Sequence, residues 1–215
     1  MTFTKVNFSL LEGFGTTCII FALTLVMAIP LGLIIAFGSM SKFKPIKYLF
    51  RCVVWVIRGT PLMLQVIIVF YGPGLFFDMP MSSRLLAVVA AFVINYACYF
   101  SEIYRGGIES ISKGQYEAGK VLGLSKGHIF FKIVLFQVIK RIIPPMSNEI
   151  ITLVKDTSLA RVIAVEELTR VSNQIVNVYG IIWPLFYAGL FYLVFNGLLS
   201  VLFSKLEKKL NYYKG

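Results

Sequence analysis

Residues Thr16–Phe37 read TTCIIFALTLVMAIPLGLIIAF, a run of 22 residues without a charged side chain. At about 1.5 Å per residue, an α-helix of this length crosses a hydrocarbon core of about 30 Å. The whole chain is 58% hydrophobic with a mean hydropathy of +0.80, whereas soluble domains hold about 45–50% apolar residues. A β-barrel would show alternating segments of about ten residues. The sequence therefore predicts an all-α integral membrane protein.

Further apolar stretches predict five transmembrane helices in a single domain covering 1–215. The expected spans are 16–37, 46–71, 85–104, 139–163 and 181–203. Lys and Arg concentrate between the first two spans, in 105–141 and in the tail from Lys205, and cytoplasmic loops collect these residues. This places the N-terminus outside and the C-terminus inside. The same asymmetry accounts for the net charge of +11, so no nucleic-acid partner is needed to explain it.

The fourth expected span is unusual because its segment 148–162, NEIITLVKDTSLARV, carries several ionisable side chains. A charge at the bilayer centre costs about 2.5–3.5 kcal/mol, so such groups generally face a polar cavity. At about 100° per residue, Asn148, Glu149, Thr152, Lys155 and Asp156 share one face of a helix. Shorter polar stripes mark the third span at Asn95, Tyr99 and Glu102, and the second at Arg58 and Gln65. Packed inward, the three stripes would line a polar path.

The connection between the third and fourth spans is about 30 residues long, which is unusual for a structureless loop. Residues 115–122, QYEAGKVL, predict a short helix, Gly123 ends it, and Ser125 is a candidate N-cap for a second helix through Ile129 and Phe130. Ala118 and Gly119 leave one face of the first helix nearly bare, so another surface can approach closely. From the pattern alone, an amphipathic helix lying on the bilayer is an open alternative.

This connection carries a resemblance to the EAA motif of ABC-transporter permeases, in which EAA is followed at fixed intervals by G, I and LP. The matching residues are Glu117, Ala118, Gly119, Gly123, Ile133 and Leu135. Gly119 stands in place of the second alanine, which keeps a small residue there. Phe136 stands in place of the proline, which puts only a local kink in doubt.

Three further segments are similar to permeases of the polar amino-acid importer family, whose members carry histidine, glutamine, arginine or opines. They are RGTPLMLQ at 58–65, EIYRGGIESI at 102–111 and KDTSLARVIAVEELTR at 155–170. The resemblance covers nearly the whole chain. It implies the type I ABC importer permease fold and a location in the bacterial cytoplasmic (inner) membrane.

The resemblance also implies partners, because in that family the EAA motif forms a cytoplasmic coupling helix, here within 105–136, that docks on an ATPase. The implied interface residues are Tyr116, Glu117, Ala118, Gly119, Lys120, Leu122 and Gly123. The chain has no GxxxxGK[ST] loop, so we expect no catalytic residue or cofactor in it, with ATP and Mg on the partner. The implied partners are two ATPase copies, a second identical or related permease, an extracellular or periplasmic amino-acid-binding protein, the amino-acid substrate and membrane lipid.

An amino acid is a zwitterion, and the polar path offers it charged and hydrogen-bonding groups. Lys155 and Asp156 would each satisfy one end, with further help if residues 155–158 break the helix and free backbone groups. An alternative places this pair at the outer headgroup boundary, where the two charges neutralise each other. The candidate substrate-binding residues are Gln65, Asn95, Tyr99, Asn148, Glu149, Thr152, Lys155, Asp156 and Ser158.

Residues 58–61 are the expected gating segment, because Gly59 and Pro61 predict a kink that can act as a hinge. Arg58 either guards the path or extends its charge toward the inner surface. A structural ion pair is expected between Glu102 and Arg105 at the cytoplasmic rim. Outside the membrane, Glu166, Glu167 and Arg170 are expected either on a solvated face or against a substrate receptor.

Three other classes of membrane protein fit the sequence less well. A secondary transporter driven by an ion gradient, with Glu149 and Asp156 relaying protons, is disfavoured because such proteins commonly show internal repeats and more helices. An intramembrane enzyme is disfavoured because neither HExxH nor GxSxG occurs. The lone cysteines and the single histidine lack metal-site spacing. A non-transporting scaffold differs from the favoured importer in not copurifying with an ATP hydrolase.

Overall fold

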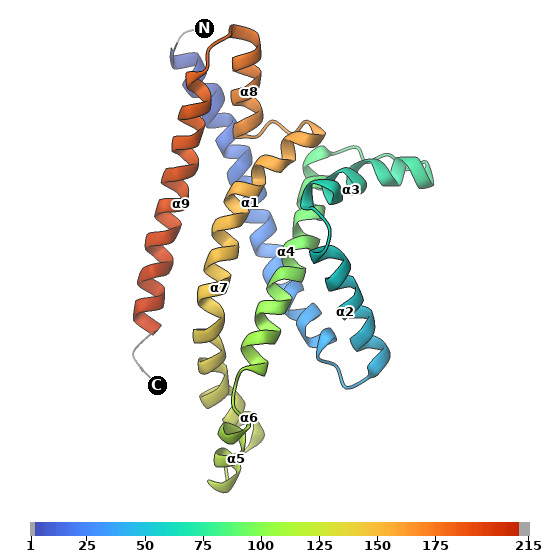
Figure 1. Ribbon diagram of the computed structural model, residues 1–215, viewed down its shortest axis with the longest axis vertical. Helices are drawn as coiled ribbons and strands as arrows, with labels where there is room; N and C mark the ends of the chain where they lie inside the picture. Colours follow the sequence, from blue (N-terminus) through green and yellow to red (C-terminus); the bar gives the residue numbers. More distant parts are fainter. Residues whose placement is uncertain (1–2, 211–215) are drawn as a thin grey trace.

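The computed structural model describes residues 3–210, and every regular element in that range is helical. A π-helical segment, Ile129–Val134, leads into α7, and a 3₁₀ segment, Thr157–Ile163, follows it. Figure 1 shows the long helices gathered side by side, with α8 at one end of the molecule and α5 and α6 at the other. The helices are α1 Phe3–Ser39, α2 Lys44–Arg58, α3 Leu62–Phe77, α4 Arg84–Glu109, α5 Lys113–Val121, α6 Lys126–His128, α7 Leu135–Asp156, α8 Leu168–Tyr179 and α9 Trp183–Leu210.

Within residues 3–210, three helices are long and apolar enough to cross a membrane, namely α1, α4 and α9. A fourth span results if α2 and α3 are taken together, although they are bent by 106° at the break between them. The expected single helix over 46–71 is therefore wrong, and the expected kink at Gly59 and Pro61 is a full break. The fourth expected span corresponds to α7, whose charged residues set it apart from an ordinary apolar span.

Helices α1 and α4 make the most extensive helix contact among the described elements, and we refer to this pair as the frame of the molecule. Small residues allow this contact, since a Cβ added at Gly32 would lie 2.9 Å from the Ala97 carbonyl oxygen and 2.9 Å from the Phe100 Cβ. Phe92, Tyr96 and Phe100 of α4 are fully or almost fully buried. One side of α4 is thus fixed to α1, which leaves its other side for α2, α3 and α7.

The connection after α7 holds a buried carboxylate. Glu167 is 0% exposed and caps α8, accepting the backbone N–H groups of Thr169 and Arg170 at 2.7 Å each. Burial raises the pKa of the Glu167 carboxyl, and these hydrogen bonds oppose the rise. The expectation that Glu167 lies on a solvated or receptor-facing surface is therefore wrong. Its neighbour Glu166 is exposed and pairs with Arg170 at 2.9 Å.

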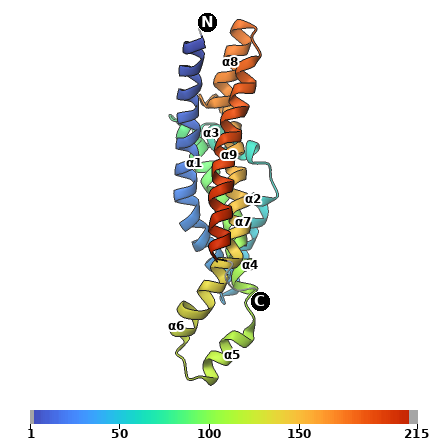
Figure 2. The same cartoon turned by 90° about the vertical axis from the view of Figure 1, so that its left-hand side faces the viewer.

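The connection between α4 and α7 projects beyond the bundle as a separate arm, as Figure 2 shows. The expected order of helix, glycine turn and helix is confirmed. Gly123 has a φ of +72°, and the Ser125 side chain accepts the His128 N–H at 3.2 Å. The first helix begins at Lys113, two residues before the expected start. Gly119 is buried against Ile129 of the same chain.

Candidate functional site

The break between α2 and α3 is held by one buried side chain, Gln65. Its amide nitrogen donates hydrogen bonds to the carbonyl oxygen of Ile57 and to the hydroxyl of Thr60, both at 2.8 Å. Its amide oxygen accepts a hydrogen bond from Asn95 of α4 at 3.0 Å. Because the Ile57 carbonyl lies at a helix end, it needs a partner from outside the helix. Gln65 thus both satisfies the broken backbone and ties the bend to α4.

A cavity of about 480 Å³ lies beside this break, and we refer to it as the central cavity. The residues come from the α2–α3 break, from α4 and from α7, so three parts of the chain build it together. Its size is within the range of small-molecule sites, about 300–1,000 Å³. The lining residues are Arg58, Gly59, Thr60, Pro61, Leu62, Asn95, Tyr96, Tyr99, Glu149, Thr152 and Asp156.

Most of the predicted binding residues meet at this cavity, and the predicted gating residues Arg58, Gly59 and Pro61 line it as well. Five of the nine binding candidates are in its lining: Asn95, Tyr99, Glu149, Thr152 and Asp156. Gln65 is not in the lining, because its amide group bonds to Ile57 at the break and to Asn95 of α4. Asn148, Lys155 and Ser158 are not among the lining residues. The helix does not open at 155–158 either, because the 3₁₀ segment continues directly from Asp156.

Lys155 is exposed, and no carboxylate lies within ion-pair distance of its ammonium group in the part of the chain that the structure describes. Within residues 3–210, Lys155 therefore forms no ion pair with Asp156. Asp156 instead accepts a hydrogen bond from the Tyr96 hydroxyl at 2.7 Å. The ionisable groups of the central cavity, apart from the tyrosines, are one guanidinium, Arg58, and two carboxylates, Glu149 and Asp156.

Two polar lining residues, Tyr96 and Thr60, were not named among the sequence-based candidates. Tyr96 is 2% exposed, yet its hydroxyl reaches Asp156 from the neighbouring helix. Its position next to Asn95 and three residues before Tyr99 was the available signal, because residues three apart share a helix face. Thr60 adds a hydroxyl at the break itself.

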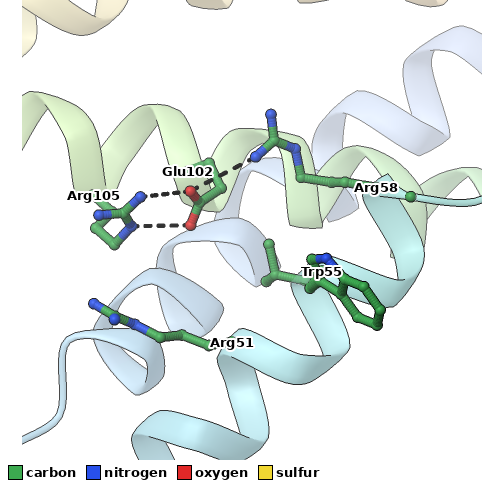
Figure 3. A pocket seen from close by; sticks show the side chains of 7 residues that line it. Arg51, Trp55, Arg58, Glu102 and Arg105 are labelled. Atoms are coloured by element: carbon green, nitrogen blue, oxygen red, sulfur yellow. Dashed lines mark hydrogen bonds and ion pairs between the residues drawn. The ribbon is translucent and has the colours of Figure 1, made fainter.

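Arg58 lies at one end of the central cavity and faces α4. Its guanidinium carbon is 5.0 Å from the centre of the Tyr99 ring, a cation–π distance. Its Nη1 atom is 3.6 Å from Glu102, which also binds Arg105 through two hydrogen bonds of 3.0 and 2.6 Å. Figure 3 shows Arg58 and Arg105 reaching Glu102 from two sides. The expected ion pair between Glu102 and Arg105 is confirmed, and Arg58 belongs to the same cluster.

The predicted ATPase-interface residues do not share one face of α5. Glu117, Ala118, Lys120, Leu122 and Gly123 are exposed, Tyr116 is partly buried, and Gly119 is buried. Val121 and Leu122 are 88% and 75% exposed, which is unusual for apolar side chains on a projecting arm. No group of three or more His, Cys, Asp or Glu side chains within residues 3–210 is arranged to hold a metal ion.

Comparison with known proteins places this geometry among transport permeases. Residues 28–212 match the family described as binding-protein-dependent transport system inner membrane component. The L-cystine transport system permease protein TcyB of Bacillus subtilis (strain 168) is 38% identical over 194 residues, covering 89% of this chain and 82% of the relative. The arginine transport system permease protein ArtQ of the same organism is 34% identical, covering 94% of this chain and 92% of the relative.

Solved structures agree with these relatives. A crystal structure of an amino acid ABC transporter with histidines superposes with a TM-score of 0.88 at 31% identity, covering 96% of both chains. The MetNI methionine ABC transporter, in an inward facing conformation, superposes with a TM-score of 0.77 over 98% of this chain and 100% of that chain. At 14% identity the second likeness shows the fold alone.

Proposed function

This chain belongs to the family of binding-protein-dependent transport system inner membrane components, and we propose that it is the membrane-spanning subunit of an ATP-driven importer of polar or basic amino acids. The main support for the proposal is that Arg58, Glu149 and Asp156 line the same cavity. These charges come from the α2–α3 break and from α7. Ionisable groups inside a membrane segment mark a polar pathway more often than a structural contact.

The balance of charge in the central cavity favours a cationic side chain on the substrate. Arg58 complements the α-carboxylate of an amino acid, since a guanidinium binds a carboxylate through two parallel hydrogen bonds. Glu149 and Asp156 then complement two positive groups, the α-ammonium and a basic side chain. Lys155, which would have balanced one of them, is not in the lining. Asn95, Thr152 and Thr60 add uncharged hydrogen-bonding groups.

In the membrane we propose five spans, formed by α1, the bent pair α2–α3, α4, α7 and α9. The N-terminus is then outside and the arm with α5 and α6 is cytoplasmic, in the bacterial cytoplasmic (inner) membrane. The basic residues of the α1–α2 turn support this orientation, because Lys42, Lys44 and Lys47 lie at the same end as the arm. At 22 residues, α7 is about 33 Å long, enough to span the bilayer.

We further propose that two such permeases, identical or related, form the pathway with two ATPase copies and an outer amino-acid-binding protein. ATP and Mg bind to the ATPases, which move the arms through the exposed residues of α5. The exposed Val121 and Leu122 support this role, because they offer an apolar surface for a groove on another protein. The α2–α3 break, with Arg58, Gly59 and Pro61, is the hinge at which access alternates.

The test is uptake of radiolabelled L-arginine by proteoliposomes that hold the complete complex, with the binding protein outside and ATP inside. Asp156→Asn and Glu149→Gln should each lower uptake and weaken substrate binding roughly tenfold, about 1.4 kcal/mol. Asp78→Asn is the matched control, because Asp78 is exposed at the end of α3 with a φ of +53°, which asparagine tolerates. Uptake driven by a proton gradient without ATP, or full binding by Asp156→Asn, would contradict the proposal.

A further inference from the structure

A second cavity lies on the other side of Arg58, toward the start of α2. It measures about 440 Å³, and we refer to it as the arginine cavity. Arg51 and Arg58 reach it from α2, and Arg105 reaches it from α4, as Figure 3 shows. The spacing of Arg51, Trp55 and Arg58 puts them on one face of α2. The lining residues are Arg51, Val54, Trp55, Arg58, Gly59, Glu102 and Arg105.

The charges of this cavity do not balance. Both oxygens of Glu102 are engaged by Arg105, whose remaining amino group binds Glu109 at 2.6 Å. Arg58 approaches Glu102 only to 3.6 Å. Arg51 is exposed and has no carboxylate within 4.0 Å among residues 3–210. Three guanidinium groups therefore line the cavity with one carboxylate, Glu102, while Glu109 outside the lining pairs with Arg105, which leaves Arg51 available to an anion.

The two cavities share one wall. Arg58 and Gly59 line both of them, and Tyr99, which lies under the Arg58 guanidinium, lines the central cavity. A carboxylate held by Arg58 in the central cavity would therefore have only this shared wall to pass before it enters the arginine cavity. Since Arg51 lies two turns before Arg58 on the same helix, the second position is displaced toward the end of the molecule that carries the arm.

We propose that the arginine cavity is a second, transient binding site for the α-carboxylate of the transported amino acid, held between Arg58 and Arg51 after the substrate leaves the central cavity. This inference rests on the proposed importer function. A transit site must bind strongly enough to receive its ligand and weakly enough to release it. Exposed charge pairs contribute little to binding affinity, which suits such a site. Glu102 and Glu109, with Arg105 between them, lower the net positive charge near the site. The anion can therefore be released.

Trp55 provides a direct reporter, because it lines the arginine cavity and is one of two tryptophans in the chain. The complete complex in nanodiscs is prepared with Trp183→Phe, and its fluorescence is compared with that of the same complex also carrying Trp55→Phe. The difference isolates Trp55. We expect L-arginine to change it saturably, and L-argininamide, which lacks the carboxylate, to leave it unchanged.

Arg51→Gln should weaken the L-arginine response roughly two- to fivefold, because the unpaired guanidinium is lost. Arg51→Lys should retain a weaker response, since an ammonium attracts a carboxylate without binding it in two places. Lys47→Gln is the control, because it removes a positive charge one turn earlier on α2 at a residue outside the cavity. Arg51 is exposed, so neither change at this residue disturbs buried packing.

Two results would overturn the carboxylate site. One is an absent Trp55 response, or an equal response to L-arginine and L-argininamide. The other is a response in phosphatidylcholine nanodiscs that disappears when phosphatidylglycerol is added, which would make the cavity a site for lipid phosphate. ATP-driven uptake measured in parallel separates this proposal from the importer. Uptake without a Trp55 response rejects the transit site alone, whereas a Trp55 response without uptake rejects the importer and, with it, the transit role of a cavity that still binds the carboxylate.

Discussion

The helix α1 and the bent pair α2–α3 both pack on α4, but they do so by different physical means. α1 meets α4 through small residues, with Gly32 in direct contact with the Ala97 backbone and Phe100. Besides apolar contacts of the buried Val54 and Val66, the α2–α3 pair meets α4 through the hydrogen bond between Gln65 and Asn95 and the ion pair between Arg58 and Glu102. The first contact leaves no room for a Cβ at Gly32, and the second borders two cavities.

The difference shows how one helix can serve as a frame and as a wall of a binding site. Close apolar packing has a single arrangement, because any relative movement opens voids or causes overlap. Hydrogen bonds and ion pairs of partly exposed groups can exchange partners with water or substrate at small cost. We therefore expect substitutions on the α1 side to change stability and those on the α2–α3 side to change transport.

Gly32→Ala should have the largest effect, because the added Cβ would overlap a backbone oxygen that cannot move without α4. We expect a loss of about 3 kcal/mol in the free energy of unfolding, measured as a lower midpoint of thermal unfolding of the purified complex. Substrate affinity of the folded fraction should not change. Gly15→Ala is the control on the same helix, because its Cβ meets nothing within 4 Å. Equal unfolding midpoints for the two variants would show that the close contact of α1 with α4 at Gly32 does not stabilise the protein.

Gln65→Leu should have a smaller effect on stability and a larger effect on transport. It removes the shortest hydrogen bond to the Ile57 carbonyl, which keeps the longer ones from Thr60, and it takes the Gln65 acceptor from the Asn95 amide, at about 1–2 kcal/mol. Since Arg58 follows Ile57, we expect ATP-driven uptake to fall roughly tenfold as the guanidinium loses its position. Asn95→Leu and the double variant complete a cycle. Additive losses in uptake would mean that Gln65 and Asn95 act separately, contrary to the hydrogen bond between them.

The sequence predicted the features that depend on local chemistry. A long apolar run can only be a membrane or core helix, and Gly59 with Pro61 interrupts any helix. The helix, glycine turn and helix of the arm were predicted for the same reason, from Gly123 and Ser125. α8 was missed because its 12 residues are amphipathic and lie in a stretch expected to be a loop. Its N-cap, Glu167, was visible only as an acidic residue between spans.

The features that depend on tertiary packing could not be predicted in this way. Lys155 and Asp156 are neighbours in sequence and point about 100° apart on a helix, so the pattern alone does not decide which of them lines the cavity. Which of them does so is decided by α4, whose Tyr96 binds Asp156. Gln65 is the right residue type for substrate binding, yet the break in its own helix pair occupies its hydrogen-bonding groups.

The smallest effect is expected in the arm, where Gly119 packs closely against Ile129 as Gly32 packs against α4. A Cβ there would lie 2.6 Å from the Ile129 Cγ1 atom, and the end of a side chain yields more easily than a backbone. We expect Gly119→Ala to cost about 1 kcal/mol and to lower ATP-driven uptake severalfold by tilting α5. Gly127→Ala, with nothing within 4 Å of its Cβ, is the control.

Adding Ile129→Ala to Gly119→Ala removes the overlap and should restore uptake in part. The contrary result is that the double variant stays as inactive as Gly119→Ala while Ile129→Ala alone transports normally. Residue 119 would then act by contact with the ATPase, and not through its packing against Ile129.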